Sequence, residues 1–242
     1  MTENHFDADV AGSYDSDSSE MFEASELKAQ VELLCELAGG GRALEFAIGT
    51  GRVALPLAAR GVEVVGIEFS EAMAEQLLLK PGGSTIPVAI GDMASARVEG
   101  SFALVYLVFN TIGNLTSQGQ QLACFENAAR HLSPGGHFLI EVGVPELRRL
   151  PPGGRHVVFH ADSDSWGIDE YDVASQRLVS HHLRKDGDAL RHRAIPFRYV
   201  WPAELDLMAL AAGMSLTHRW AGWQREPFAH ESTKHVSVWT KA

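Results

Sequence analysis

The segment from Ala43 to Ser70, ALEFAIGTGRVALPLAARGVEVVGIEFS, limits the possible folds more than any other part of the chain. A short apolar run leads into a glycine-rich turn, then into a helix-forming stretch and, after Gly61, into a second apolar run. Short apolar runs bounded by turn residues are typical of buried strands. The segment therefore predicts a strand at 42–47, a turn and a helix at 49–60 and a strand at 62–68, which together make a βαβ unit.

The same alternation of helices and strands extends on both sides of this unit. A helix is predicted from Leu27 to the glycines at 39–41, and another from its cap at Ser70 to about Leu79. Further strands are expected at 84–90, 102–109 and 137–142, with a helix at 119–132 and a turn at 133–136. The run at 102–109 is apolar on both faces, which is typical of a central strand in a parallel sheet.

The alternation stops between 157 and 200, where the chain has shorter strand-like runs. The runs 176–184 and 190–200 meet through Asp186 and Gly187, a strong signal for an antiparallel hairpin. A helix with Pro202 at its first position and Gly213 as its terminator follows. Two last strands are expected near 215–220 and 235–239.

Composition and charge argue against several classes of partner. The chain of 242 residues has a formal net charge of -11 and no dense run of Lys or Arg, so we expect no nucleic-acid partner. Its longest apolar run is too short to cross a bilayer, so we expect no membrane partner and a cytoplasmic protein. The two cysteines lie far apart, and the adjacent His181 and His182 should point to opposite faces of one strand. Neither pattern predicts a metal site.

Three acidic residues stand at predicted strand ends, namely Glu45, Glu68 and Asp92. The glycine turn GTGRVA also fits a dinucleotide-binding pattern, and Glu68 could accept hydrogen bonds from ribose hydroxyls in either kind of cofactor. Negative charge at Glu45 would repel a pyrophosphate but favour the sulfonium and ammonium groups of S-adenosyl-L-methionine. Asp92 could accept from an adenine amino group. An NAD-dependent oxidoreductase remains the alternative.

At this point the chain resembles the class I S-adenosylmethionine-dependent methyltransferases that act on small molecules. The matching segments are EFAIGTGR, VVGIEFSEAM, GDM, YLVFNTIGNL and LSPGGHFLIEV, which follow one another in the family's order between about 40 and 143. The resemblance implies methyl transfer to a nitrogen or oxygen atom of a small-molecule acceptor, with S-adenosyl-L-homocysteine as product. A non-catalytic protein that binds S-adenosylmethionine is a further alternative, and a monomer and a homodimer both remain open.

The resemblance also implies a fold of the α/β class: a Rossmann-like, mostly parallel seven-stranded sheet with helices on both faces, an N-terminal helical lid and a small antiparallel β insertion. We expect residues 1–38 to form the lid or cap, 39–145 and 201–242 the cofactor-binding core, and 146–200 the insertion that shapes the substrate site. Ile48 and Ala47 depart from the residues common in the family, yet we expect the turn to survive both changes.

The resemblance assigns cofactor contacts to strand ends, to the turns after them and to the lid. The implied residues are Tyr14, Glu45, Ala47, Gly49, Thr50, Gly51, Glu68, Phe69, Met73, Gly91, Asp92, Met93, Val108 and Phe109.

Candidates for the acceptor side come from the fourth strand end and the insertion. Asn110 stands at an edge where ligands bind, or is a turn former. His160, with Asp162 two residues on, could act as a base, or could simply be a polar side chain exposed to solvent. Candidate substrate residues are Asn110, Trp166, Tyr171, Arg198 and Tyr199, with core packing as the alternative for the aromatic ones; the candidate catalytic residues are His160, Asn110 and Tyr199.

Overall fold

The computed structural model describes residues 10–12, 14, 24–187 and 189–242. Residues 10–12 and 14 are helical, and helix α2 spans Ala24–Ala38. Most of the predicted N-terminal lid lies outside the described residues, so the lid stays a prediction. Among the described residues, no helix is both long and apolar enough to cross a membrane.

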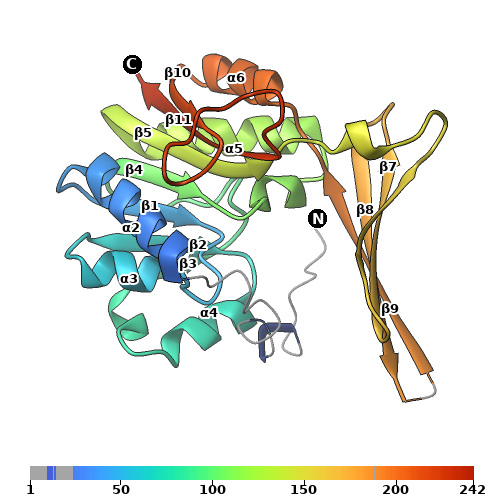
Figure 1. The fold of residues 1–242 in the computed structure, drawn as a ribbon. Coiled ribbons are helices and arrows are strands. Elements are labelled where there is room, and N and C mark those ends of the chain that lie inside the picture. Colours follow the sequence, from blue (N-terminus) through green and yellow to red (C-terminus); the bar gives the residue numbers. More distant parts are fainter. Residues whose placement is uncertain (1–9, 13, 15–23, 188) are drawn as a thin grey trace.

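A seven-stranded sheet forms the centre of the molecule, with the strand order β10-β11-β5-β4-β1-β2-β3 (Figure 1). The five strands from β5 to β3 run parallel, and β11 and β10 add an antiparallel edge. The predicted mostly parallel, seven-stranded α/β fold is confirmed. The strands are β1 Ala43–Phe46, β2 Val64–Glu68, β3 Val88–Ile90, β4 Phe102–Leu107, β5 Leu132–Gly143, β10 Met214–Trp220 and β11 Lys234–Lys241.

Helices cover both faces of this sheet. Alternate strand residues point to opposite faces, so that Leu44 and Phe46 pack in one apolar cluster while Ala43 packs in the other. The first cluster includes residues of α5 (Gln118–His131) and α6 (Pro202–Ala211). The second includes residues of α2, of α3 (Ala54–Ala59) and of α4 (Glu71–Leu78). The sheet is therefore buried on both sides, and its strand ends are left for the site.

Three sequence-based boundaries were wrong. Only Val88–Ile90 of the expected strand 84–90 is a strand, because Gly83–Thr85 closes into a 3-10 helix. The fourth strand stops at Leu107, since Phe109 and Asn110 have φ angles of 69° and 59° and cannot continue an extended chain. The expected turn at 133–136 lies within β5, where the register with β4 shifts.

The insertion forms a separate four-stranded antiparallel sheet, which we call the arm. Its strands are β6 His156–Ala161, β7 Ser165–Asp172, β8 Arg177–Asp186 and β9 Ala189–Arg198, in that order across the sheet. The predicted hairpin is β8 and β9. Figure 1 shows the arm projecting from one side of the α/β part.

The base of the arm is fixed next to the end of β4. A Cβ on Gly113, in the 3-10 helix Thr111–Asn114 that follows β4, would lie 3.5 Å from the Arg198 carbonyl oxygen. Arg198 forms an ion pair of 2.7 Å with Glu204 of α6, and the side chain of Gln121 in α5 donates to the Arg198 carbonyl. The arm therefore starts at the edge of the sheet where the parallel strands end.

Candidate active site

Glu68 and the glycine turn meet at the carboxyl ends of β1 and β2. The backbone N–H of Gly49 donates to Glu68 Oε2 over 2.8 Å, and that of Ser70 donates to Oε1 over 2.9 Å. Burial raises the pKa of Glu68 above its ordinary value, while these N–H donors oppose the rise. The turn and the acidic strand end, which are far apart in sequence, thus form one unit.

The turn depends on glycine at position 51. Gly51 has a φ of +79°, and a Cβ there would lie 2.3 Å from Cδ1 of Leu77 in α4. A side chain would have both the wrong backbone angle and no room. Ala47 holds a φ of 53°, and Ile48 packs directly on Gly66 of β2, whose missing side chain makes space for it. The turn therefore accommodates both departures from the family pattern.

Glu45 is buried at the end of β1, with 2% of its surface exposed. Desolvation raises its pKa to about 8, although a hydrogen bond from Tyr106 and the charge of Arg52 act in the opposite direction. The sequence argument assumed a charged carboxylate. In the ligand-free protein near neutral pH, however, this group is mostly protonated, because burial disfavours its charge.

The other predicted cofactor residues lie around the ends of β2 and β3. Gly91 donates its N–H to the Glu68 carbonyl, and Asp92 Oδ1 accepts from the N–H of Ala94 over 2.8 Å. Phe69 is 42% exposed, which is unusual for a large apolar side chain beside a turn. Thr50, Met73 and Met93 are buried next to this edge.

A left-handed turn follows β4. Val108 is buried, whereas Phe109 and Asn110 both have positive φ angles, a conformation that costs a residue with a side chain about 1–2 kcal/mol, and less for Asn. The Oδ1 atom of Asn110 accepts from the N–H of Gly143 at the end of β5, at 2.5 Å. Adjacent strained residues of this kind are characteristic of binding sites.

A cavity of about 280 Å³ opens beside this turn, between the ends of β4 and β5 and helix α2. Sequence reasoning named two of its lining residues, Phe109 and Asn110, and missed the charged ones. The lining consists of Glu26, Gln30, Arg52, Phe109, Asn110, Glu141, Val142, Gly143 and Lys234. Glu141 lies near the end of β5, two residues before Gly143, and Glu68 is the last residue of β2, so the same signal of an acidic residue near a strand end could have identified Glu141. Glu26 and Lys234 come from distant segments with no local signal.

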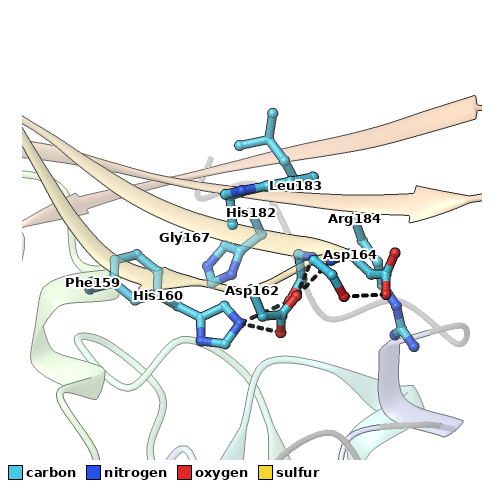
Figure 2. A pocket seen from close by; sticks show the side chains of 11 residues that line it. Phe159, His160, Asp162, Asp164, Gly167, His182, Leu183 and Arg184 are labelled. Atoms are coloured by element: carbon cyan, nitrogen blue, oxygen red, sulfur yellow. Dashed lines mark hydrogen bonds and ion pairs between the residues drawn. The ribbon is translucent and has the colours of Figure 1, made fainter.

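A second hollow of about 650 Å³ lies on the arm (Figure 2). His160 Nε2 lies 3.0 Å from Asp162 Oδ2 and 2.8 Å from the hydroxyl of Ser165. The N–H groups of Asp164 and Ser165 donate to Asp162 and hold its pKa well below the usual range. The lining consists of Phe159, His160, Asp162, Ser163, Asp164, Ser165, Trp166, Gly167, His182, Leu183 and Arg184.

Three predicted substrate residues lie elsewhere. Tyr171 and Tyr199 pack ring to ring, 5.7 Å apart, in a small apolar cluster of the arm. Arg198 is buried in its ion pair with Glu204. None of the three lines either cavity: the two tyrosines pack within the insertion, and Arg198 binds Glu204 of α6. Tyr14 is half-buried within the few described residues of the predicted lid.

In the part of the chain that the structure describes, no group of three or more His, Cys, Asp or Glu side chains is arranged to hold a metal ion. His181 and His182 go to different partners: His181 stacks on His192, and His182 packs against Phe159.

A family model, a related sequence and solved structures all relate this chain to methyltransferases. A family model described as a methyltransferase domain matches residues 43–136. The structure of the CcbJ methyltransferase from Streptomyces caelestis is 34% identical, covers 90% of this chain and 90% of its own, and superimposes with a TM-score of 0.80. The cypemycin N-terminal methyltransferase of a Streptomyces species is 26% identical over 202 residues, which is 82% of each chain.

A further structure shows how widely the fold is shared. A S-adenosylmethionine-dependent methyltransferase from Clostridium acetobutylicum superimposes with a TM-score of 0.76 over 96% of this chain and 98% of its own, at 12% identity. At that identity the likeness concerns the fold alone. Together with the turn, the acidic strand ends and the strand order, the similarity to CcbJ leads to one conclusion: the chain belongs to the class I S-adenosylmethionine-dependent methyltransferases.

Proposed function

We propose that this S-adenosylmethionine-dependent methyltransferase transfers the methyl group to the nitrogen atom of a small-molecule amine. The observation that carries the proposal is the match to the cypemycin N-terminal methyltransferase over 82% of each chain, because an N terminus is an amine. The net charge of -11 supports it, since a negative protein attracts a cationic acceptor.

The residues at the strand ends fit the cofactor by their chemistry. Glu68 retains lone pairs that can accept from the ribose hydroxyls beyond its two backbone donors. The exposed face of Phe69 and the buried Met93 offer apolar contact for the adenine, and Asp92 can accept from its amino group. Glu45 and the turn from Ala47 to Gly51 would surround the methionine part. When bound, this cofactor supplies a methyl group that is already activated on a cationic sulfur.

The protein therefore contributes mainly orientation. Holding the acceptor nitrogen in line with the methyl carbon can provide up to about 7–11 kcal/mol of the barrier reduction. The cavity beside Asn110 lies at the edge of the sheet next to the turn, and we assign the reacting nitrogen to it. The short turn that carries Asn110 is fixed to β5 through Gly143, so the wall of this cavity is rigid.

We assign the rest of the acceptor to the hollow on the arm, whose lining includes the aromatic side chains of Phe159 and Trp166. Because Asp162 stays ionised, it accepts from the Nε2–H of His160, which leaves the Nδ1 lone pair able to accept from a second N–H or O–H group of the acceptor. His160 is thus our candidate for binding the acceptor in this hollow. The reacting nitrogen is assigned to the other cavity, so His160 is not assigned as its base.

The proposal is tested with methyl-labelled cofactor and matched panels of primary and secondary amines, phenols and carboxylic acids. We expect label in amines alone. Replacing His160 with Asn should raise the KM for the acceptor by about 10-fold with little change in kcat, because His160 binds a part of the acceptor away from the reacting nitrogen.

His230→Asn is the matched control, since that side chain is exposed and lies outside both cavities. Methylation of phenols or carboxylic acids in place of amines would refute the nitrogen acceptor. An unchanged KM in His160→Asn would remove His160 from acceptor binding while leaving the acceptor class intact.

A further inference from the structure

Two backbone N–H groups of the left-handed turn after β4 bind the same residue of the neighbouring strand, Glu141. The N–H of Asn110 donates to the backbone carbonyl of Glu141 over 3.2 Å, and the N–H of Phe109 donates to Glu141 Oε2, also over 3.2 Å. Both N–H groups of the strained pair therefore end on Glu141. A backbone in this conformation persists only when its surroundings fix it.

The second carboxylate oxygen of Glu141 is also engaged. Trp223 donates from Nε1 to Glu141 Oε1 over 2.9 Å, and the ammonium of Lys234 lies 3.7 Å from the same oxygen. Lys234 in turn contacts Glu26 of α2 over 2.5 Å. With 7% of its surface exposed, Glu141 is a nearly buried carboxylate whose donors come from three separate segments.

If Glu141 only supported the fold, fewer hydrogen bonds to its carboxylate would suffice. A single acceptor oxygen would satisfy the Trp223 indole, and a neutral side chain could supply it. The other oxygen instead reaches the N–H of Phe109, whose ring lies 5.1 Å from the Arg52 guanidinium that follows the glycine turn. Glu141 thus fixes the backbone of a residue whose ring reaches the turn expected to hold the cofactor.

We propose that Glu141 is a positioning residue for cofactor binding, which acts through the backbone of Phe109 and makes no cofactor contact of its own. The proposal rests on the proposed placement of Phe109 against the cofactor. In Glu141→Gln, the amide can accept from one of the two N–H donors while its NH₂ group faces the other. The left-handed turn then loses one of the bonds that hold it.

A double-mutant cycle tests this coupling, with calorimetry of S-adenosylhomocysteine as the measurement and no acceptor needed. Glu141→Gln should weaken binding by about 10-fold, as expected for one lost hydrogen bond to a charged group. Phe109→Ala should weaken it by a similar factor, and the double variant should be no weaker than the weaker single variant, because both changes remove the same contribution. Trp223→Phe, which leaves the bond to Phe109 in place, is the matched control and should change affinity by less than about 3-fold.

Losses that multiply in the double variant would overturn the proposal, as would unchanged affinity in Glu141→Gln. If Glu141→Gln does not fold, Glu141→Asp serves in the same cycle, because its shorter side chain keeps the charge but withdraws the oxygen from Phe109. Failure here is distinct from failure of the amine proposal, since an intact cycle with no methylated amine would refute the acceptor class alone.

Discussion

Tyr106 donates a hydrogen bond of 2.8 Å from its hydroxyl to Glu45 Oε2, and both side chains are buried between β1 and β4. The phenol and the carboxyl thus form a polar pair at the strand ends where the cofactor is expected. Burial raises the pKa of both groups, that of Glu45 to about 8. The pair therefore makes the stability of the protein depend on pH.

Replacing Glu45 with Gln should stabilise the protein at alkaline pH. The folded pKa lies above the ordinary value of 4.5, so the contribution of Glu45 to stability is full below pH 4.5 and is lost as pH rises through 8. At pH 9 the variant should gain up to about 4–5 kcal/mol in the free energy of unfolding. Denaturant unfolding between pH 5 and 9 measures this. If the free energy of unfolding changed equally with pH in the wild type and in Glu45→Gln, the prediction would be contradicted. Glu63→Gln, which replaces an exposed acid, is the control.

Cofactor binding should release protons near neutral pH. At pH 7 Glu45 is mostly protonated, and an ammonium group placed beside it would favour the ionised form. Calorimetry with S-adenosylhomocysteine in buffers of different ionisation enthalpy should give a release approaching about one proton. Glu45→Gln should abolish the dependence on the buffer. Persistence of the dependence in that variant would assign the proton to another group.

Glu68→Ala should weaken cofactor binding strongly. Each hydrogen bond to a charged group contributes about 1.5–3 kcal/mol, so loss of one or two ribose contacts should lower affinity by at least about 10-fold. The change also removes the acceptor for the N–H of Gly49 and thus loosens the turn. Competition binding with S-adenosylhomocysteine is the measurement. Unchanged affinity would exclude Glu68 from the cofactor site.

Gly51→Ala and Gly119→Ala should have opposite effects on stability. At position 51 the new Cβ would lie 2.3 Å from Leu77 with φ at +79°, and we expect a loss of more than about 2 kcal/mol. At position 119, inside α5, a Cβ meets nothing within 4 Å, and alanine should add about 0.5–1 kcal/mol. Thermal unfolding compares the two variants. A stable Gly51→Ala would show that α4 can move away from the turn.

Two arginines on the same arm should differ in importance. Arg198→Ala leaves Glu204 without its buried partner and should cost about 3–5 kcal/mol in the free energy of unfolding. Arg191→Ala breaks an exposed ion pair with Asp186 and should cost at most about 1 kcal/mol. Denaturant unfolding measures both variants. Equal losses in the free energy of unfolding for the two variants would mean that the Arg198–Glu204 ion pair does not anchor the arm to the core.

Much of the fold could be predicted because local signals agreed with one another. The glycine turn, the apolar runs and the hairpin at Asp186 and Gly187 each predicted a turn or a strand that the structure contains. The family assignment also answers the two open alternatives, the NAD-dependent oxidoreductase and the non-catalytic binding protein, in favour of a methyltransferase.

The remaining features depend on contacts between distant segments. The sequence shows that Glu45 is acidic, but its protonation follows from burial against Tyr106 of another strand. Tyr171 and Tyr199 were candidates for a substrate pocket with core packing as the alternative, and the structure shows the two rings packed against each other. The charged lining from Glu26 and Lys234 arises only when α2 meets β11. Such pairings have no local signature.

The attachment of the arm at its base has a further consequence for how the enzyme can diversify. The four strands form a sheet of their own, and Arg198 joins that sheet to the core at one end. With the acceptor assigned to the arm as proposed, mutations toward the free tip would alter which molecules are accepted without disturbing the residues proposed to hold the methyl donor. Selectivity and catalysis could then evolve on separate parts of one chain.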